Sequence, residues 1–319
     1  MNRRDFLRNA ILAGAGLGLA GCRTSPGPSA AGPDGKIGRN RFQPGPVNGV
    51  DLAVAKGKPA AELVAAALGV FGGMAAFVKA GDRVLLKPNI GWSRTPEQAA
   101  CTSPEVLAAV IAACQGAGAK EVLVADHSCD ASQVCFDLSG AAAVCKQAGV
   151  PLIDWSGQQV YREVQYSKGQ TIRTDQVPSD LLDCDVYINL PTLKHHSATL
   201  VTLALKNQMG AIFDRGRYHA EKGSAGEDNL HRNIVDLATG LRPTLNILDA
   251  TRALKTNGPK GPGLVEEPGV VCASPNIVAV DAYGARLLGH DPAAIAHLVM
   301  ASAAGLGSHD LASLVIREA

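Results

Sequence analysis

The 319-residue sequence is poor in aromatic residues, at 4%, and carries almost no excess charge, with 30 basic residues against 29 acidic ones. Proteins that bind nucleic acid need a basic surface to meet the phosphates, so this balance excludes a nucleic-acid partner. The hydrophobic share is nevertheless 46%, and 35 residues are glycine. Such a composition excludes a disordered chain and is typical of α/β domains in which small residues let helices pack closely on a sheet.

Cysteine spacing excludes one class of cofactor. None of the 8 cysteines forms a C-x-x-C or C-x₂-C-x₂-C pattern, so we expect no iron–sulfur cluster. Three cysteines in apolar surroundings are expected to be buried thiols, namely Cys114, Cys145 and Cys272. An exported chain is permitted disulfides, and Cys129 with Cys135 or Cys145 is then the local candidate pair.

Residues 1–22 have the pattern of an export signal. The sequence N-R-R-D-F-L-R closely matches a twin-arginine signal, and the apolar run that follows it is too short to span a bilayer. The sequence L-A-G-C resembles a lipoprotein processing box, in which Cys22 becomes the lipidated first residue. We therefore expect the twin-arginine export machinery as a partner. The mature protein is expected on the periplasmic side, held to the membrane by a lipid anchor.

After the signal the sequence predicts a linker and one domain. Residues 23–49 are rich in Pro, Gly and Ser and are expected to form a flexible linker. Residues 50–319 alternate strand and helix patterns, which predicts a single α/β domain with a mostly parallel sheet and helices on both faces. Residues 160–177 alternate like a small β-hairpin insertion with its turn at Lys168-Gly169, forming a possible sub-lobe near residues 156–180.

Polar side chains follow several of the predicted strands. These side chains are Lys87, Asn89, Asp126, His127, Lys194, His195, His196 and Asp249. Because parallel strands end at the same edge of a sheet, we expect them to meet in one cleft. The lysines suit a phosphate or a carboxylate, so a small anionic molecule is one expected partner. The histidines and carboxylates suit a divalent metal ion whose identity the sequence leaves open.

The stretch from Asn189 to Gly210 carries the densest chemistry. Its pattern predicts a strand stopped by Pro191, a loop with Lys194 and the two histidines, and a helix capped by Ser197. The amide groups and the dipole at a helix N-terminus favour an anion and disfavour a protonated imidazole. One histidine should therefore stay neutral, ready to bind metal or accept a proton.

Roles follow from this expected geometry. The candidate catalytic residues are His195, His196 and Lys206. The candidate substrate-binding residues are Lys87, Asn89, Lys194, Asn207, Arg217 and His219. The candidate metal ligands are Asp126, His127, His195, His196 and Asp249.

The motif N-L-P-x-L-K-x-H, followed by a helix ending L-K-N-x-x-G, resembles the central signature of the domain-of-unknown-function family numbered 362. Arg217-Tyr218-His219 resembles that family's R-x-x-H-like element and would be either a lid or a surface loop. Gly258–Gly263 resembles its G-P-x-x-G loop and has no nucleotide-binding pattern. Ala273–Asp281 resembles its A-S-x-D-P-V-A-V-D stretch, with Asn276 in place of the usual Asp. The resemblance implies a fold and a site but names no reaction.

Three functions are compatible with these patterns. The first is a metal-assisted enzyme acting on a small anionic substrate, with His195 or His196 as ligand or general base. The second is a non-catalytic binding protein that delivers a metal ion or an anion to a membrane partner. The third is a thiol-based redox accessory protein that uses Cys129.

Overall fold

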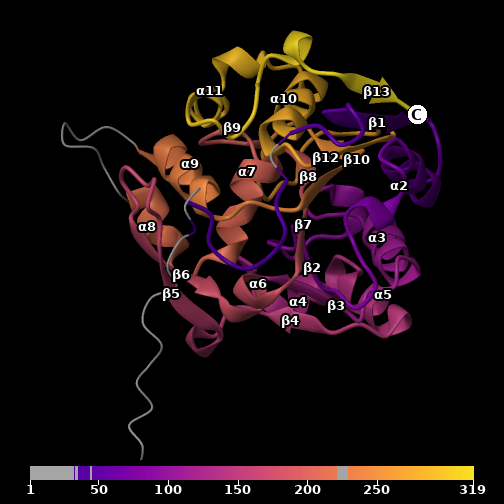
Figure 1. The fold of residues 1–319 in the computed structure, drawn as a ribbon, viewed down its shortest axis with the longest axis horizontal. Helices are drawn as coiled ribbons and strands as arrows, with labels where there is room; N and C mark the ends of the chain where they lie inside the picture. Colours follow the sequence, from indigo (N-terminus) through magenta and orange to yellow (C-terminus); the bar gives the residue numbers. More distant parts are fainter. Residues whose placement is uncertain (1–31, 33–34, 44, 221–228) are drawn as a thin grey trace, which may run out of the picture.

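The computed structural model describes residues 32, 35–43, 45–220 and 229–319 (Figure 1). The strands are β1 (Leu52–Lys56), β2 (Arg83–Pro88), β3 (Glu121–Asp126), β4 (Leu152–Asp154), β5 (Tyr161–Gln165), β6 (Thr174–Pro178), β7 (Val186–Leu190), β8 (Thr192–His196), β9 (Leu200–Val201), β10 (Leu245–Leu254), β11 (Val265–Glu266), β12 (Val270–Ser274) and β13 (Ile316–Glu318). The α-helices are α2 (Ala60–Gly69), α3 (Pro104–Gly116), α4 (Ser132–Leu138), α5 (Ala141–Ala148), α6 (Ser179–Asp183), α7 (Leu203–Asn207), α8 (Arg215–Ala220), α9 (Leu230–Gly240), α10 (Ile277–Leu288) and α11 (Ala296–Ala303).

One large sheet organises the domain. Its main path has the strand order β13-β1-β12-β10-β7-β2-β3-β4. Along this path β12 is antiparallel to both neighbours, whereas the other pairs are parallel. The mostly parallel α/β sheet expected from the sequence is therefore confirmed. As a consequence, β2, β3 and β7 end at the same edge of the sheet.

Helices cover both faces of this sheet, because its buried strands are apolar on both sides. Val84 and Leu86 face a core shared with α2, α3 and α5, whereas Leu85 faces the opposite core with α7, α9 and α10. Figure 1 shows these two groups of helices on either side of the strands. By the same alternation, Lys87 points to the α7 side at the end of β2.

The β-hairpin insertion is also present, and it lies beside the main sheet. Strands β5 and β6 pair only with each other, from Tyr161↔Pro178 to Gln165↔Thr174. The turn near the predicted Lys168-Gly169 is closed by a hydrogen bond from Gly169 N to Tyr166 O. Tyr166 and Val164 of this hairpin are buried in the core on the α9 side.

The expected linker over residues 23–49 is wrong in its second half. Ile37 is buried, and its backbone N–H donates to Gly240 O. Arg41 forms an ion pair with Asp82, and Asn40 donates to Arg242 O. The Pro- and Gly-rich composition hid these contacts, because they are made to residues far away in the sequence. The signal over residues 1–22, with Cys22, lies outside the described residues. No helix in the described ranges is long and apolar enough to cross a membrane.

Candidate functional site

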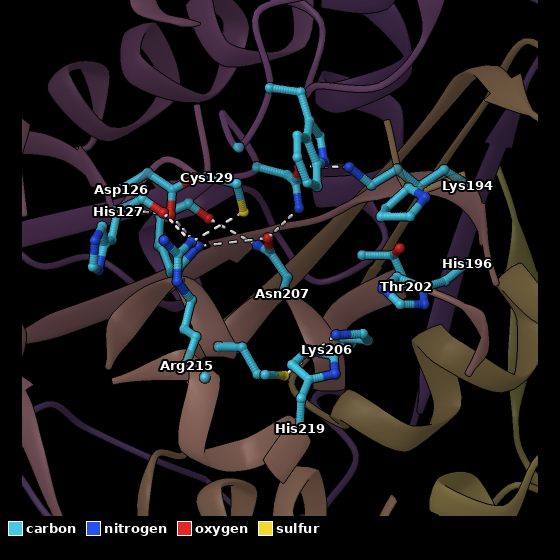
Figure 2. Close-up of a pocket in the computed structure, with 18 residues that line it drawn as sticks. Asp126, His127, Cys129, Lys194, His196, Thr202, Lys206, Asn207, Arg215 and His219 are labelled. Atoms are coloured by element: carbon cyan, nitrogen blue, oxygen red, sulfur yellow. Dashed lines mark hydrogen bonds and ion pairs between the residues drawn. The ribbon is translucent and has the colours of Figure 1, made fainter. Parts of the chain in front are cut away.

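A cavity of about 480 Å³ lies where β2 and β3 end, bounded by β8, α7 and α8 (Figure 2). Among the residues predicted for the site, those that line it are Lys87, Asn89, Asp126, His127, Lys194, His196, Lys206, Asn207 and His219. The parallel strand ends therefore do bring together side chains that are far apart in the sequence. Three predicted residues, His195, Arg217 and Asp249, lie elsewhere.

The loop expected around Lys194 is in fact the strand β8. Thr192–His196 pairs with β10 on one side, with Lys194 opposite Leu254, and with β9 on the other. Successive side chains of a strand point to opposite faces, so Lys194 and His196 share the cavity side and His195 does not. The expected helix begins only at Leu203, so Ser197 is not its cap. The helix-dipole explanation for a neutral histidine is therefore wrong for this chain.

The helix α7 is held in place by a buried carboxylate instead. Asp281 of α10 accepts hydrogen bonds from the backbone N–H groups of Ala204 and Leu205, at 2.6 and 2.9 Å. These amides belong to the first turn of α7, where backbone N–H groups have no partner inside the helix. Asp281 thus supports the helix that carries Lys206 and Asn207.

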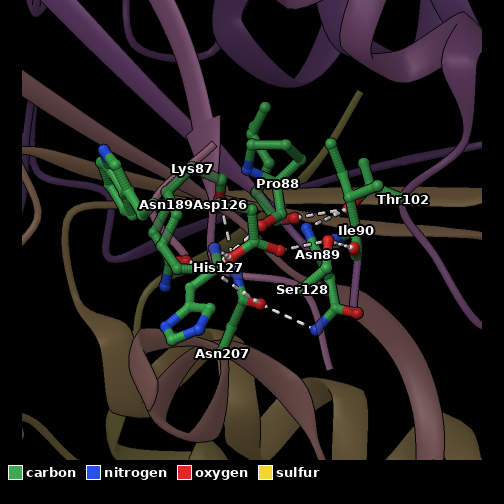
Figure 3. Close-up of polar contacts among 12 residues, drawn as sticks. Lys87, Pro88, Asn89, Ile90, Thr102, Asp126, His127, Ser128, Asn189 and Asn207 are labelled. Atoms are coloured by element: carbon green, nitrogen blue, oxygen red, sulfur yellow. Dashed lines mark hydrogen bonds and ion pairs between the residues drawn. The ribbon is translucent and has the colours of Figure 1, made fainter. Parts of the chain in front are cut away.

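Lys87 and Asp126 form a buried ion pair on the cavity floor (Figure 3). Nζ lies 2.7 Å from Oδ1, and the side chains are 1% and 3% exposed. The other carboxylate oxygen accepts the backbone N–H of Ile90 at 2.7 Å. Burial lowers the pKa of Lys87, and the charge of Asp126 opposes that shift. The two charges therefore neutralise each other, so neither is the main attraction for a ligand.

A chain of side-chain amides connects this floor to the second lysine, Lys194. Figure 3 shows three of these amides, those of Asn89, Asn207 and Asn189. Lys194 Nζ donates to Asn89 Oδ1, Asn89 Nδ2 donates to Asn207 Oδ1, and Asn207 Nδ2 donates to Asn189 Oδ1, each at 2.8 Å. Asn189 Nδ2 in turn donates to Asn246 Oδ1 at 3.1 Å. Each oxygen in this chain is engaged, which fixes the orientation of every amide and holds Lys194 in one position.

Lys206 is the cation with the fewest compensating contacts. The residue is 8% exposed, and the only hydrogen bond recorded for its Nζ among the described residues goes to the Met209 sulfur, at 3.4 Å. A thioether is a weak acceptor, so the ammonium is buried without a counter-charge. Burial lowers the pKa of Lys206 to about 8, and burial likewise lowers the pKa of Lys194 to about 8. Each lysine is thus poised to exchange a proton near neutral pH.

His196 supplies a neutral donor beside these lysines. Burial, followed by the positive charges of Lys206 and Lys194, lowers the pKa of His196 to about 2. Its Nδ1 accepts the backbone N–H of Ala198 at 3.1 Å, so the single proton resides on Nε2. The expectation of a neutral histidine holds, but its cause is burial among cations. The imidazole offers an N–H to a ligand and is no general base.

Arg215 and Cys129 form the opposite wall of the cavity (Figure 2). Arg215 Nη1 donates to His127 O at 2.7 Å and to Cys129 Sγ at 3.2 Å, and Nη2 donates to Ser128 O at 2.8 Å. The guanidinium is therefore fixed against the turn that follows β3. Arg215 was not predicted as a site residue, because its contacts join positions 86 to 88 residues apart. Cys129 was named from the sequence for a disulfide and for the thiol-based redox alternative, not as a site residue.

The loop Gly258–Gly263 closes the rim of the cavity. Pro259 lines the cavity, and the Lys260 ammonium lies 3.0 Å from Asp130 Oδ1 and 5.4 Å above the centre of the Trp92 ring. These contacts join three loops that are distant in the sequence. The family-like loop thus has a structural place at the site, as a wall and not as a nucleotide cradle.

The expected metal centre is not assembled. No three His, Cys, Asp or Glu side chains lie close enough together to hold a metal ion anywhere in the described ranges. Asp249 is buried away from the cavity, where it accepts the N–H groups of Ser103 and Thr251. His195 accepts the N–H of Gly258 with Nδ1, as His196 does that of Ala198. A histidine that binds a metal with one ring nitrogen usually donates an N–H from the other. In His195 and His196 Nδ1 accepts a hydrogen bond instead, so neither ring has the bonding pattern of a metal ligand.

The third histidine on the cavity, His127, has the opposite tautomer. Its Nδ1 lies 3.2 Å from Ile212 O, which can only accept, so Nδ1 carries the proton and Nε2 is left as an acceptor. Tyr161 Oη also contacts Nδ1, at 3.1 Å. Burial, and then the charge of Arg215, lowers the pKa of His127. Unlike His195 and His196, whose Nδ1 atoms accept a backbone N–H, His127 has a bonding pattern suited to accepting a proton.

The predictions for His219, Arg217 and the cysteines have different outcomes. His219, at the end of α8, lines the cavity, whereas Arg217 turns away to donate to Thr174 O and lies 3.7 Å from Asp175 Oδ2. All seven cysteines in the described part of the chain are free, so the candidate disulfides of Cys129 are not formed in this structure. Cys114, Cys145 and Cys272 are buried as expected.

Comparison with known proteins agrees with the resemblance seen in the sequence. Residues 84–286 match the family model described as "Domain of unknown function (DUF362)". The chain is 31% identical over 237 residues to the thylakoid-associated protein sll1697 of Synechocystis sp., which covers 74% of this chain and 72% of that protein. The lactate racemase apoprotein of Thermoanaerobacterium thermosaccharolyticum superimposes with a TM-score of 0.48 at 11% identity, over 79% of this chain and 61% of that one. This chain spans less than two thirds of that structure, a partial likeness from which no function follows. The match over residues 84–286 and the identity to the cyanobacterial protein show that the chain belongs to the DUF362 family.

Proposed function

We propose that the cavity binds a small organic anion and that the protein acts on it as an enzyme. The observation that carries this proposal is the charge around the cavity. Lys87, Lys194, Lys206 and Arg215 line it against a single carboxylate, Asp126. Cations buried without counter-charges cost folding free energy, which a bound carboxylate or phosphate would recover.

A catalytic role is favoured over passive binding by the protonation states. Two lysines with pKa values of about 8 can give or take protons near neutral pH, and His127 has an unprotonated nitrogen. Groups whose pKa values are shifted towards neutrality gather at catalytic sites, which favours an enzyme over a carrier. Resident metal is not part of this proposal, because the donors expected to hold it are dispersed or already bonded.

The proposal also places the protein outside the cytoplasmic membrane, anchored by a lipid on Cys22. Its support is the twin-arginine pattern and the L-A-G-C box of residues 1–22. Fractionation of cells that express Cys22→Ser tests the anchor, since the variant should leave the membrane fraction. A variant that stays with the membrane would contradict lipid attachment at this residue.

Lys206→Met is the variant that tests anion binding. Calorimetric titration of the full chain with simple carboxylates, inorganic phosphate and sulfate should find at least one that binds. The variant should bind it about 10- to 100-fold more weakly, as expected for the loss of a hydrogen bond to a charged group. Its melting temperature without ligand should not fall, because methionine replaces a buried ammonium that has no counter-charge.

Lys120→Met is the matched control, because Lys120 is exposed and lies away from the cavity. It should bind the anion as the wild type does. The proposal is wrong if the wild type binds none of these anions, or if Lys206→Met binds them unchanged.

The pH dependence of binding gives an independent check. A bound anion stabilises protonated lysines, whereas burial favours their neutral forms in the empty cavity. Affinity should therefore be highest below pH 8 and fall above it, by up to about tenfold per pH unit for each lysine that must take up a proton. Titrations between pH 6.5 and 9.5 measure this slope, which should be shallower in Lys206→Met. A pH-independent affinity would separate the two lysines from binding.

A further inference from the structure

Cys129 differs from the other described cysteines in its exposure. The other six are buried, whereas Cys129 is exposed and lines the cationic cavity. Its position is fixed by the backbone, since its N–H donates to Gly91 O at 2.8 Å. Its Sγ accepts a hydrogen bond from Arg215 Nη1 at 3.2 Å. The guanidinium and the backbone contact together hold the sulfur at the cavity wall, where a bound compound can reach it.

The surrounding cations act on the same atom. A negative charge at the Cys129 sulfur would interact favourably with the ammonium groups of Lys87, Lys194 and Lys206, which line the same cavity. Figure 2 shows the sulfur among the side chains that line the cavity, together with Lys206 and Lys194. An anionic compound held by those lysines would therefore share the cavity with the thiol.

A second observation points to a ligand at this place and does not depend on the cysteine. The Lys206 side chain is more than nine-tenths buried and lines the same cavity, yet its ammonium has no oxygen acceptor among the described residues. An anion bound beside this ammonium would offset the cost of burying its charge. The cavity thus combines a binding group for an anion with a thiol that can react with it.

We infer that Cys129 is the nucleophile of this site and forms a covalent adduct with a small electrophile that carries a carboxylate or a phosphate. This inference rests on the proposed function, because the cationic wall selects the compound that reaches the sulfur. In the step itself a lone pair of Sγ forms the S–C bond. The bond from that carbon to the leaving group breaks, its electron pair goes to the leaving group, and the thiol proton departs with it. No electrons are exchanged with an outside reagent.

Alkylation with a charged and a neutral reagent tests this assignment. Iodoacetate carries a carboxylate, iodoacetamide is its neutral analogue, and with each of them iodide leaves as the S–C bond forms. Each reagent is added to the full chain with glutathione in the same tube as a reference thiol. Mass spectrometry of the peptide that contains Cys129 follows the rate. The ratio of iodoacetate to iodoacetamide rates should be about tenfold or more higher for Cys129 than for glutathione, because the cationic cavity concentrates the anion.

Two lysine variants test whether the cationic cavity causes the preference of Cys129 for iodoacetate. In Lys206→Met the ratio should fall towards that of glutathione, whereas in Lys120→Met it should stay at the wild-type value. The inference is overturned if Cys129 reacts with neither reagent, or if it shows the reagent preference of glutathione. Calorimetry on the wild type separates the two proposals. If the anion binds but alkylation is not selective, only the assignment of Cys129 as the nucleophile is wrong. If no anion binds, the proposed function itself is wrong.

Discussion

Asp126→Asn is expected to lower the free energy of unfolding by about 3–5 kcal/mol, the usual cost of leaving one partner of a buried ion pair uncompensated. The change removes the counter-charge of Lys87, whose ammonium lies 2.7 Å from Oδ1 in a place that is almost inaccessible to water. It also halves the acceptors available to two backbone N–H groups, since Ile90 N and His127 N each bond to a different oxygen of this carboxylate. Denaturant unfolding at neutral pH measures the loss.

A double variant separates the effect of the lost charge on stability from the effect of the lost hydrogen bonds. Lys87→Met combined with Asp126→Asn removes both charges and keeps one acceptor oxygen, so it should be more stable than Asp126→Asn alone. Asp137→Asn is the surface control, because Asp137 is exposed and its carboxylate accepts from Gln133 four residues earlier. It should change the free energy of unfolding by less than about 0.5 kcal/mol. A loss below about 1 kcal/mol in Asp126→Asn would show that Lys87 finds another partner.

The position of this ion pair could be predicted from the sequence because both residues end strongly apolar strands. Val84–Leu86 and Val122–Ala125 are buried on both faces, and such runs are recognisable in a short window. Parallel pairing of these two strands then places Lys87 and Asp126 at the same edge. The expectation that a polar residue after an apolar run lies at the sheet edge failed for Asp249. The strand β10 does not end there but continues to Leu254, so the carboxylate lies within the strand.

The strand β8 could not be predicted, and with it the separation of the two histidines. Its five residues include a lysine and two histidines, a polar composition that does not indicate a buried strand. It forms because the unusually long β10 offers a hydrogen-bonding edge, where Lys194 pairs with Leu254, 60 positions away. Arg215 was missed for the same reason, since its importance lies in carbonyl groups on the turn after β3. Contacts of this kind have no local sequence pattern.

Gly210→Ala is expected to destabilise the protein and to disable the cavity together. A Cβ at this position would overlap Asp126 Oδ1 and would lie 2.6 Å from Lys87 Nζ and 2.9 Å from its Cε, closer than real contacts of a Cβ. Neither the pair nor the backbone can yield easily, because Asp126 is tied to Ile90 N and Asn207 precedes the glycine in the same turn. We expect a loss of about 1–3 kcal/mol from overpacking alone, and more if the ion pair separates.

Gly116→Ala is the matched control, because a Cβ at that exposed helical position would have nothing within 4 Å. It should be neutral or slightly stabilising, since alanine restricts the unfolded chain. Chemical unfolding and anion titration of both variants measure the two effects. Gly210→Ala should bind the anion at least about tenfold more weakly, because displaced Lys87 and Asn207 no longer align the amide chain that orients Lys194. If stability falls while anion affinity is unchanged, the ion pair supports the fold only, and the binding role belongs to Lys194, Lys206 and Arg215 without it.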